Sequence, residues 1–161
     1  MPSRAAAHPP AEGDPAPEIE LADDRGTPFQ LSRLRGKNVV LYFYPKANTS
    51  GCTKEACAFR DNARKFTKAD TVIVWVSPDK SPAQASFKAK YDLPFTLLAD
   101  TAHAAAEAWG VWKEKSMYGR KYMGIERTTF LIDKTGKVAR IFPKVKIEGH
   151  AEEVLEALAA L

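Results

Sequence analysis

The sequence predicts a single α/β domain, in which helices flank a central mixed β-sheet and a hairpin lies near the N-terminal end. Two apolar runs, residues 39–44 and 72–76, are rich in β-branched and aromatic residues, as expected for strands that are buried on both faces. In the segments between and after these runs, the apolar residues have the spacing that is typical of amphipathic helices. Strands and helices therefore alternate along the chain.

The elements of the first half follow in order. Residues 19–21 and 28–31 bracket the turn-forming sequence DDRG, which predicts the N-terminal hairpin. A helix is expected over residues 52–66, between the two buried strands. A second helix is expected over residues 82–91, because Ser81 is a suitable N-cap and a proline follows it at the first helical position.

The second half adds strands and two further helices. Residues 95–98 predict a short strand, and the alanine-rich residues 102–109 predict a helix. Residues 128–133 and 138–142 flank the turn sequence KTGK and predict a hairpin. An amphipathic helix is expected at residues 151–161. Strand–helix–strand units that end in a hairpin and a helix indicate a thioredoxin-like α/β domain.

Length and composition are those of one globular domain, with 161 residues of which 45% are hydrophobic. No segment approaches the roughly 20 apolar residues of a transmembrane helix, and the start of the chain lacks the hydrophobic block of a secretory signal. Residues 1–13 are rich in Pro, Ala and small polar residues, which predicts a flexible tail before a domain at residues 14–161. We therefore expect a cytoplasmic protein without a membrane partner.

The formal net charge is +4, from 24 basic and 20 acidic residues. Basic residues are scattered among acidic and apolar ones, and their densest cluster, at residues 113–121, also contains Tyr118. A nucleic-acid-binding surface has a similar composition, but a solvated, charged loop is the interpretation that we favour. No nucleic-acid partner is expected.

Both cysteines, Cys52 and Cys57, lie in the segment PKANTSGCTKEAC at residues 45–57. Five residues along a helix give a rise of roughly 7.5 Å and an offset of roughly 140°, so the two Cα atoms are about 8 to 9 Å apart. A disulfide requires less than ~7 Å. An intact helix therefore forbids the bond. The pair is either two unrelated thiols or a switch that closes after local unwinding.

Cys52 begins the apolar stripe of the predicted helix, whereas Cys57 lies on another face and is expected to be more accessible. Because a polar segment, residues 48–51, precedes it, the Cys52 thiol meets free backbone N–H groups and the positive end of the helix dipole, which favour a thiolate. No motif places one of the three histidines as a base. Two buried structural thiols are the alternative.

The pattern Pro45-x-x-x-Thr49-x-x-Cys52 resembles the active-site motif of the peroxiredoxins, the cysteine-dependent peroxidases. The longer stretch YFYPKANTSGCTKEACAFRD resembles the PrxQ subgroup, also called bacterioferritin comigratory proteins. This resemblance covers nearly everything beyond the tail and includes the segment ERTTFLID at residues 126–133. Ser50 departs from the proline that is usual in the subgroup, which predicts a more mobile loop and an unchanged reaction class.

The resemblance implies that Cys52 is the peroxidatic cysteine and that Cys57 is the resolving cysteine in the same helix. Cys52 would attack hydrogen peroxide or an organic hydroperoxide and become a sulfenic acid. The helix would then unwind, a Cys52–Cys57 disulfide would form, and thioredoxin or a similar dithiol would reduce it. This scheme requires no metal, flavin or other cofactor, and the resemblance implies a monomer.

Four further residues match positions of the family's active site. The resemblance implies that Arg127 is the active-site arginine, that Thr49 hydrogen-bonds the peroxide and the thiolate, and that Pro45 shields the pocket from water. Glu55 matches an acidic position that helps to orient the arginine. Taken singly, each residue has a structural explanation. Arg127 would be a surface charge and Thr49 a helix cap. Pro45 would end a strand, and Glu55 would be an acidic residue in the first turn of the helix.

Three other functions could use a pair of cysteines. A thioredoxin-like disulfide oxidoreductase is expected to contain Cys-x-x-Cys, which this chain lacks. A redox-sensing or chaperone-like protein, whose helix switches on oxidation, stays open as an added role. A metal-binding module is disfavoured, because two cysteines and dispersed histidines form no ligand set of recognisable spacing.

Overall fold

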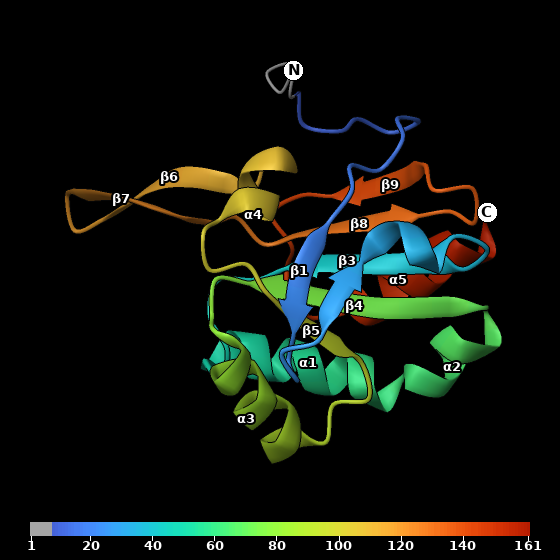
Figure 1. The fold of residues 1–161 in the computed structure, drawn as a ribbon, viewed down its shortest axis with the longest axis horizontal. Coiled ribbons are helices and arrows are strands. Elements are labelled where there is room, and N and C mark those ends of the chain that lie inside the picture. The colour runs from blue at the N-terminus through green and yellow to red at the C-terminus, as the bar shows by residue number, and fades with distance from the viewer. Residues whose placement is uncertain (1–7) are drawn as a thin grey trace.

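A computed structural model describes residues 8–161, which form a seven-stranded mixed sheet and a separate two-stranded ribbon (Figure 1). The strands of the sheet are β1 (Glu20–Asp23), β2 (Pro28–Gln30), β3 (Asn38–Phe43), β4 (Thr71–Ser77), β5 (Thr96–Ala99), β8 (Thr128–Ile132) and β9 (Val138–Phe142). The ribbon consists of β6 (Trp112–Met117) and β7 (Arg120–Ile125). The helices are α1 (Ser50–Asp61), α2 (Ala63–Lys68), α3 (Ser81–Tyr91), α4 (Ala104–Ala108) and α5 (His150–Ala159), with a 3-10 turn η2 (Leu31–Leu34).

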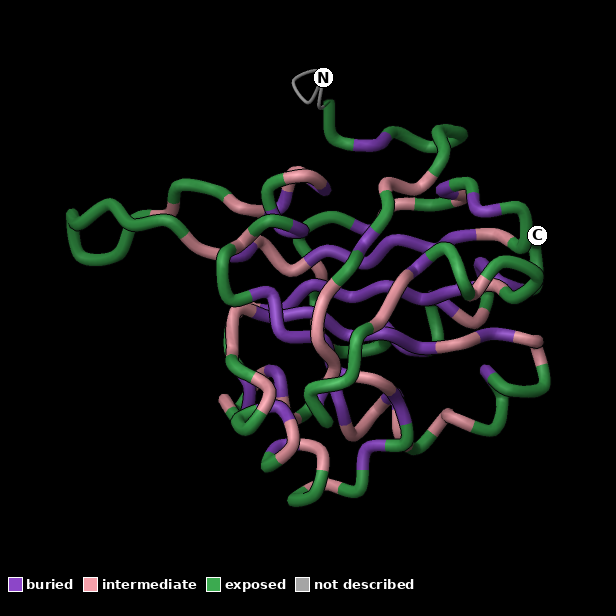
Figure 2. The backbone as a smooth tube through the Cα atoms, viewed as in Figure 1, coloured by how far each residue is buried: buried purple, intermediate pink, exposed green. Residues whose placement is uncertain are grey.

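The strand order in the sheet is β2-β1-β5-β4-β3-β8-β9, with β3, β4 and β5 parallel to one another. The two apolar runs form the central strands β3 and β4, and Figure 2 shows the middle of the sheet as buried. Alternate residues of β3 enter two separate cores. Tyr42 packs in the core beneath α1 and α5, and Phe43 packs in the core beneath α4. The predicted mixed sheet with helices on both faces is confirmed.

The register between β3 and β8 determines which loops meet at the edge of the sheet. β8 runs antiparallel to β3, and Phe43 lies opposite Thr128. The start of β8 is therefore next to the end of β3, so Arg127 lies beside the loop that leads from β3 into α1. This edge brings together segments that are more than 70 residues apart in the sequence.

The predicted helix over residues 52–66 is in fact two helices that meet at Asn62. The backbone of Asn62 (φ −104°, ψ 9°) interrupts the helix, and its side-chain amide donates to the Ala58 carbonyl at 2.8 Å. Asparagine side chains compete in this way with the backbone hydrogen bonds of a helix. The apolar stripe persists across the break, since Cys52, Phe59 and Phe66 are all buried.

Two other helix starts differ from expectation. Ser81 is the first residue of α3 and not its N-cap, because its hydroxyl donates to the Asp23 carbonyl at 2.8 Å. The helix expected over residues 102–109 is shortened to α4. The Asp100 carboxylate accepts hydrogen bonds from the Ala105 and Ala106 N–H groups at 3.1 and 2.9 Å, which stabilises this later start.

The prediction of a charged loop at residues 113–121 was wrong, because this cluster forms most of the ribbon. The turn between β6 and β7 has left-handed backbone at Tyr118 (φ 52°) and Gly119 (φ 78°), as in the tight turns that match the twist of a hairpin. Most side chains of both strands are exposed. The polar–apolar alternation that would have signalled strands is therefore absent.

The first seven residues of the predicted tail lie outside the described residues, and the described part of the tail contacts the domain. The Gly13 N–H donates to the Val138 carbonyl at 2.7 Å, and the Glu12 carboxylate accepts from the Ile141 N–H at 3.0 Å. Residues 12 and 13 are therefore held along β9. Within residues 8–161, none of the helices combines the length and apolar character needed to span a bilayer.

Candidate active site

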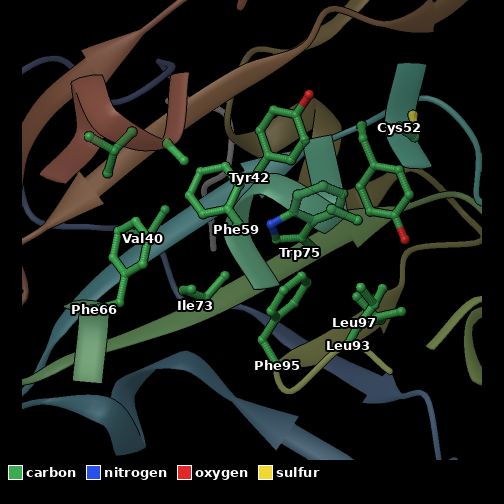
Figure 3. Packing of buried hydrophobic residues seen from close by; sticks show 14 of the residues in the cluster. Val40, Tyr42, Cys52, Phe59, Phe66, Ile73, Trp75, Leu93, Phe95 and Leu97 are labelled. Carbon is green, nitrogen blue, oxygen red and sulfur yellow. The ribbon is translucent and has the colours of Figure 1, made fainter. Parts of the chain in front are cut away.

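The two cysteines occupy different environments on α1. Cys52, in the first turn, is completely buried, whereas Cys57 is half-buried, and both thiols are free. Cys52 belongs to the same apolar cluster as Tyr42, Phe59 and Trp75, and Figure 3 shows it at one end of that cluster. As the helical spacing predicts, the first sulfur faces the core and the second is more accessible.

Hydrogen bonds to Asp79, which follows β4, anchor the loop between β3 and α1. The Asp79 carboxylate accepts hydrogen bonds from the Ala47 N–H at 2.7 Å and from the Ser77 hydroxyl at 2.6 Å. Asn48 adopts a left-handed backbone (φ 62°), and its side-chain oxygen accepts from the Tyr91 hydroxyl at 3.2 Å. These bonds hold the loop in one shape immediately before Cys52.

Thr49 is the N-cap residue of α1, but its side chain does not cap the helix. Its hydroxyl donates to the Lys46 carbonyl at 3.1 Å, and no side-chain cap bond is formed at this end by any described residue. The helix cap that is the structural explanation of Thr49 is therefore not formed. The first N–H groups of α1 thus have no side-chain oxygen as acceptor. Pro45 is half-buried at the start of the same loop.

Arg127 lies against the first turn of α1, as the register of β3 and β8 requires. Its Nη1 donates to the Tyr42 hydroxyl at 3.3 Å. A Cβ atom placed on Gly51 would lie 3.0 Å from Arg127 Nη2 and 3.0 Å from Ile147 Cδ1. Gly51 therefore leaves the space that the guanidinium occupies. Burial acts to lower the pKa of Arg127, but the hydrogen bond to Tyr42 and the nearby Cys52 sulfur raise it above its ordinary value.

Glu55 is fully buried on the second turn of α1, and neither carboxylate oxygen has a hydrogen-bond partner within residues 8–161. Burial raises the pKa of Glu55 to about 8, with Arg127 opposing the shift and Glu152 and Glu153 adding to it. A charged carboxylate is strongly disfavoured in such a place, so Glu55 is largely neutral at pH 7. No hydrogen bond links it to Arg127 in the described chain, so its orienting role stays a prediction.

The burial of Glu55 predicts a pH-dependent stability. The pKa of Glu55 is about 8 in the folded protein and 4.5 in the unfolded protein. The contribution of this difference to the free energy of unfolding is therefore present in full below pH 4.5 and is lost as the pH rises toward 8. The free energy of unfolding should fall by up to about 1.4 kcal/mol per pH unit between pH 5 and pH 8. Urea unfolding of the reduced protein across this range should show a shallower slope for Glu55→Gln. Glu156→Gln, an exposed control, should keep the wild-type slope.

Three side chains at the site were missed by sequence reasoning. Tyr42 lies in a run interpreted as core, although Tyr42 and Tyr44 alternate just before the active loop and both hydroxyls take part in hydrogen bonds. Asp79 belongs to none of the motifs identified in the sequence. Lys115 is half-buried on β6, and its Cδ would lie 3.3 Å from a Cβ on Gly124. Burial, followed by the charge of Arg127, lowers the pKa of Lys115.

The arrangement supports nucleophilic chemistry at sulfur. A thiolate at a helix start, beside an arginine, is both stabilised and reactive. In the part of the chain that the structure describes, no three His, Cys, Asp or Glu side chains group closely enough to hold a metal ion.

A mixed α/β domain with a buried thiol at a helix start beside a cation defines a cysteine-based oxidoreductase. The AhpC/TSA family pattern matches residues 12–141. The chain is 51% identical to peroxiredoxin Bcp of Bacillus subtilis over 146 residues, which cover 91% of this chain and 93% of that protein. The chain belongs to the AhpC/TSA family and, within it, to the Bcp or PrxQ peroxiredoxins, which are peroxidases, as the sequence resemblance implied.

Solved structures agree with this assignment. A cysteine-to-serine mutant of PrxQ from Xylella fastidiosa superimposes with a TM-score of 0.90 at 36% identity, covering 95% of this chain and 98% of that one. A Xanthomonas campestris bacterioferritin comigratory protein, described as having alkyl peroxide reduction activity, gives a TM-score of 0.84 at 41% identity, covering 88% and 90%. The predicted thioredoxin-like fold is thereby confirmed.

Proposed function

We propose that the protein reduces hydrogen peroxide and organic hydroperoxides through a Cys52 sulfenic acid. Cys57 resolves this acid as an intramolecular disulfide, and thioredoxin or a similar dithiol protein reduces the disulfide. One observation supports this cycle above the others: two free thiols lie five residues apart on one helix, the first buried beside Arg127 and the second half-buried.

In the first step the Cys52 thiolate attacks the nearer oxygen of the hydroperoxide. An S–O bond forms as the O–O bond breaks, and the leaving oxygen takes a proton to become water or an alcohol. Arg127 and the uncapped N–H groups of α1 stabilise the charge that moves from sulfur to oxygen. Thr49 donates to the peroxide once its hydroxyl leaves the Lys46 carbonyl, and Pro45 limits the entry of water.

Access to Cys52 requires movement, because its side chain has no exposed surface. The loop at residues 45–49 or the Arg127 side chain must shift before even a small peroxide reaches the sulfur. Loop motions of this kind are fast compared with catalytic turnover. Ser50 in place of a proline leaves the loop freer to move.

The second step requires α1 to unwind, because an intact helix keeps the two Cα atoms about 8 to 9 Å apart. The Cys57 sulfur then attacks the Cys52 sulfur, forms the S–S bond and expels water. Two features of the helix favour unwinding from its first turn. Thr49 provides no side-chain cap, and the buried Glu55 carboxyl gains hydrogen bonds to water when it is released.

The reductant must reach the oxidised pair, and a groove over α1 supports contact at Cys57. The groove has a volume of about 840 Å³ and includes Cys57, Lys54, Lys90 and Tyr91 in its lining. The attacking thiolate takes the more accessible sulfur. Regeneration by a dithiol requires a reducing compartment, so we place the protein in the cytoplasm. We also propose that it acts as a monomer, as the family resemblance implies.

Thiol titration after one equivalent of hydrogen peroxide tests the proposal. Wild type should lose both titratable thiols and the mass of two hydrogen atoms. Cys57→Ser should keep a rapid first oxidation, accumulate a sulfenic acid that a dimedone probe traps, and lose turnover driven by thioredoxin and its reductase. Ala58→Ser, a half-buried neighbour on α1, is the matched control and should behave as wild type.

Two results would contradict the proposal. If both thiols remain titratable after peroxide, Cys52 is not the peroxidatic residue. If Cys57→Ser turns over with thioredoxin at the wild-type rate, Cys57 is not the resolving residue, although the peroxidase assignment would stand.

A further inference from the structure

The ribbon β6–β7 is a separate two-stranded sheet that projects from the domain (Figure 1). At its root Ile125 is buried and Trp112 packs against the core beneath α4. At about 3.3 Å per residue, six residues per strand give the ribbon a reach of roughly 17 Å. Figure 2 shows its outer part as exposed. A two-stranded ribbon of this kind is only marginally stable in water by itself.

The ribbon holds most of the large apolar side chains that are exposed in the described part of the chain. Of five such side chains in the described residues, four lie here: Met117, Tyr118, Tyr122 and Met123, which are 56%, 98%, 44% and 48% exposed. The fifth is Leu161, near the C-terminal end. Clustered exposed apolar residues mark interaction sites, whereas single ones do not.

The same ribbon is basic. Its cations are Lys113, Lys115, Arg120 and Lys121, and its one acid, Glu114, pairs with Lys121 at 3.7 Å. The register places Lys115 opposite Tyr122 and Met117 opposite Arg120, so these four side chains share one face. Met123 lies opposite Glu114 on the other face. Cationic and apolar groups therefore surround the ribbon and are not confined to one side.

We propose that this ribbon docks the protein on the surface of an anionic lipid bilayer, with Met117 and Tyr118 at its tip entering the headgroup region. Basic residues attract anionic headgroups, and tyrosine favours the boundary between water and hydrocarbon. A fluid interface surrounds an inserted tip on all sides, which suits apolar groups on both faces. The expectation of no membrane partner rests on the absence of long apolar runs, and docking by an exposed tip needs no such run.

Other occupants fit the ribbon less well. A second copy of the chain would bring its row of cations against an identical row, which is unfavourable. A nucleic acid would use the cations and the tyrosines, but methionine side chains offer no flat surface on which a base stacks. An anionic bilayer uses the cations, the tyrosines and the methionines together.

Docking by the tip would also fix the position of the catalytic edge. β7 ends at Ile125, and Arg127 follows two residues later. The root of the ribbon therefore adjoins the site around Cys52, so a docked protein holds that site within the length of the ribbon from the membrane. The proposal does not depend on the disulfide cycle, since it concerns only where the protein is held.

Cosedimentation with vesicles tests the proposal. The reduced full-length protein should bind vesicles of phosphatidylglycerol and phosphatidylcholine at 50 mM salt, should bind pure phosphatidylcholine far less, and should be released at 0.5 M salt. Replacing two tip cations, in Arg120→Gln/Lys121→Gln, should weaken partitioning about 30-fold. Met117→Ser/Tyr118→Ser should also weaken it, by about tenfold.

Matched controls lie elsewhere on the surface. Among residues 8–161, Leu161 is the one exposed large apolar side chain outside the ribbon, and Leu161→Ser removes it. Lys68→Gln removes an exposed cation on α2. Both should bind vesicles as wild type does. All variants should consume hydrogen peroxide in solution at the wild-type rate, which also shows that they fold.

Three outcomes would overturn the proposal. The first is equal binding to vesicles with and without anionic lipid, or equal weakening by the control variants. The second is a solution dimer that the tip variants convert to monomer, which would show that a second copy covers the ribbon. The third is ribbon-dependent binding to double-stranded DNA without binding to vesicles.

Discussion

Replacing Cys52 with serine is expected to reduce peroxide consumption to the rate of buffer alone. A hydroxyl at this helix start stays protonated and is a far weaker nucleophile than a thiolate, and no other described cysteine shares its buried position beside Arg127. The measurement is peroxide loss with thioredoxin and its reductase present in excess.

A matched control is available on the same face of α1. Ala56→Ser places a serine hydroxyl in the same apolar cluster one turn later, where no chemistry is assigned. It should cost some stability and keep activity. Equal rates for wild type and Cys52→Ser would refute the peroxidatic assignment.

Replacing Arg127 with leucine is expected to slow the oxidation of Cys52 by about 10²- to 10³-fold, the usual effect of removing a donor that stabilises transition-state charge. The guanidinium is held by the Tyr42 hydroxyl and lies over Gly51, next to the thiol. The rate is measured in a single turnover of reduced protein mixed with hydrogen peroxide.

Two milder variants should slow the oxidation of Cys52 less than Arg127→Leu does. Arg127→Lys keeps the positive charge but loses the planar guanidinium with its paired N–H donors, so its oxidation rate should lie between those of Arg127→Leu and wild type. Gly51→Ala keeps the arginine, but its new Cβ, 3.0 Å from Nη2, must push the guanidinium by a few tenths of an ångström, which should give a smaller loss. Arg25→Leu, in an exposed turn, should have no effect. Equal rates for Arg127→Leu and wild type would remove Arg127 from the mechanism.

The fold was predictable wherever burial imposes a pattern. β3 and β4 are buried on both faces, so their sequences are apolar throughout, and the hairpin of β8 and β9 has a clear turn signal. The ribbon escaped prediction for the opposite reason, because neither of its faces is buried and no alternation results. The break at Asn62 depends on a single side-chain hydrogen bond that periodicity does not report.

The site was predictable to a smaller extent. The local motif places Pro45 and Thr49 on the loop before α1 and Cys52 in the first turn of that helix, because all three are close in the sequence. Arg127 was found only through family resemblance, since its contact with Tyr42 depends on how β3 and β8 are aligned. No local pattern determines that alignment.

The burial of Glu55 also affects the reduction potential of the cysteine pair. When α1 unwinds as proposed, this carboxyl enters water, and its pKa of about 8 returns toward 4.5. Forming the disulfide near neutral pH therefore releases an additional proton. The midpoint potential of the Cys52–Cys57 couple should fall by about 30 mV more per pH unit than that of an isolated dithiol over this range. An alkaline shift would thus favour the oxidised form, and Glu55→Gln would abolish the excess slope.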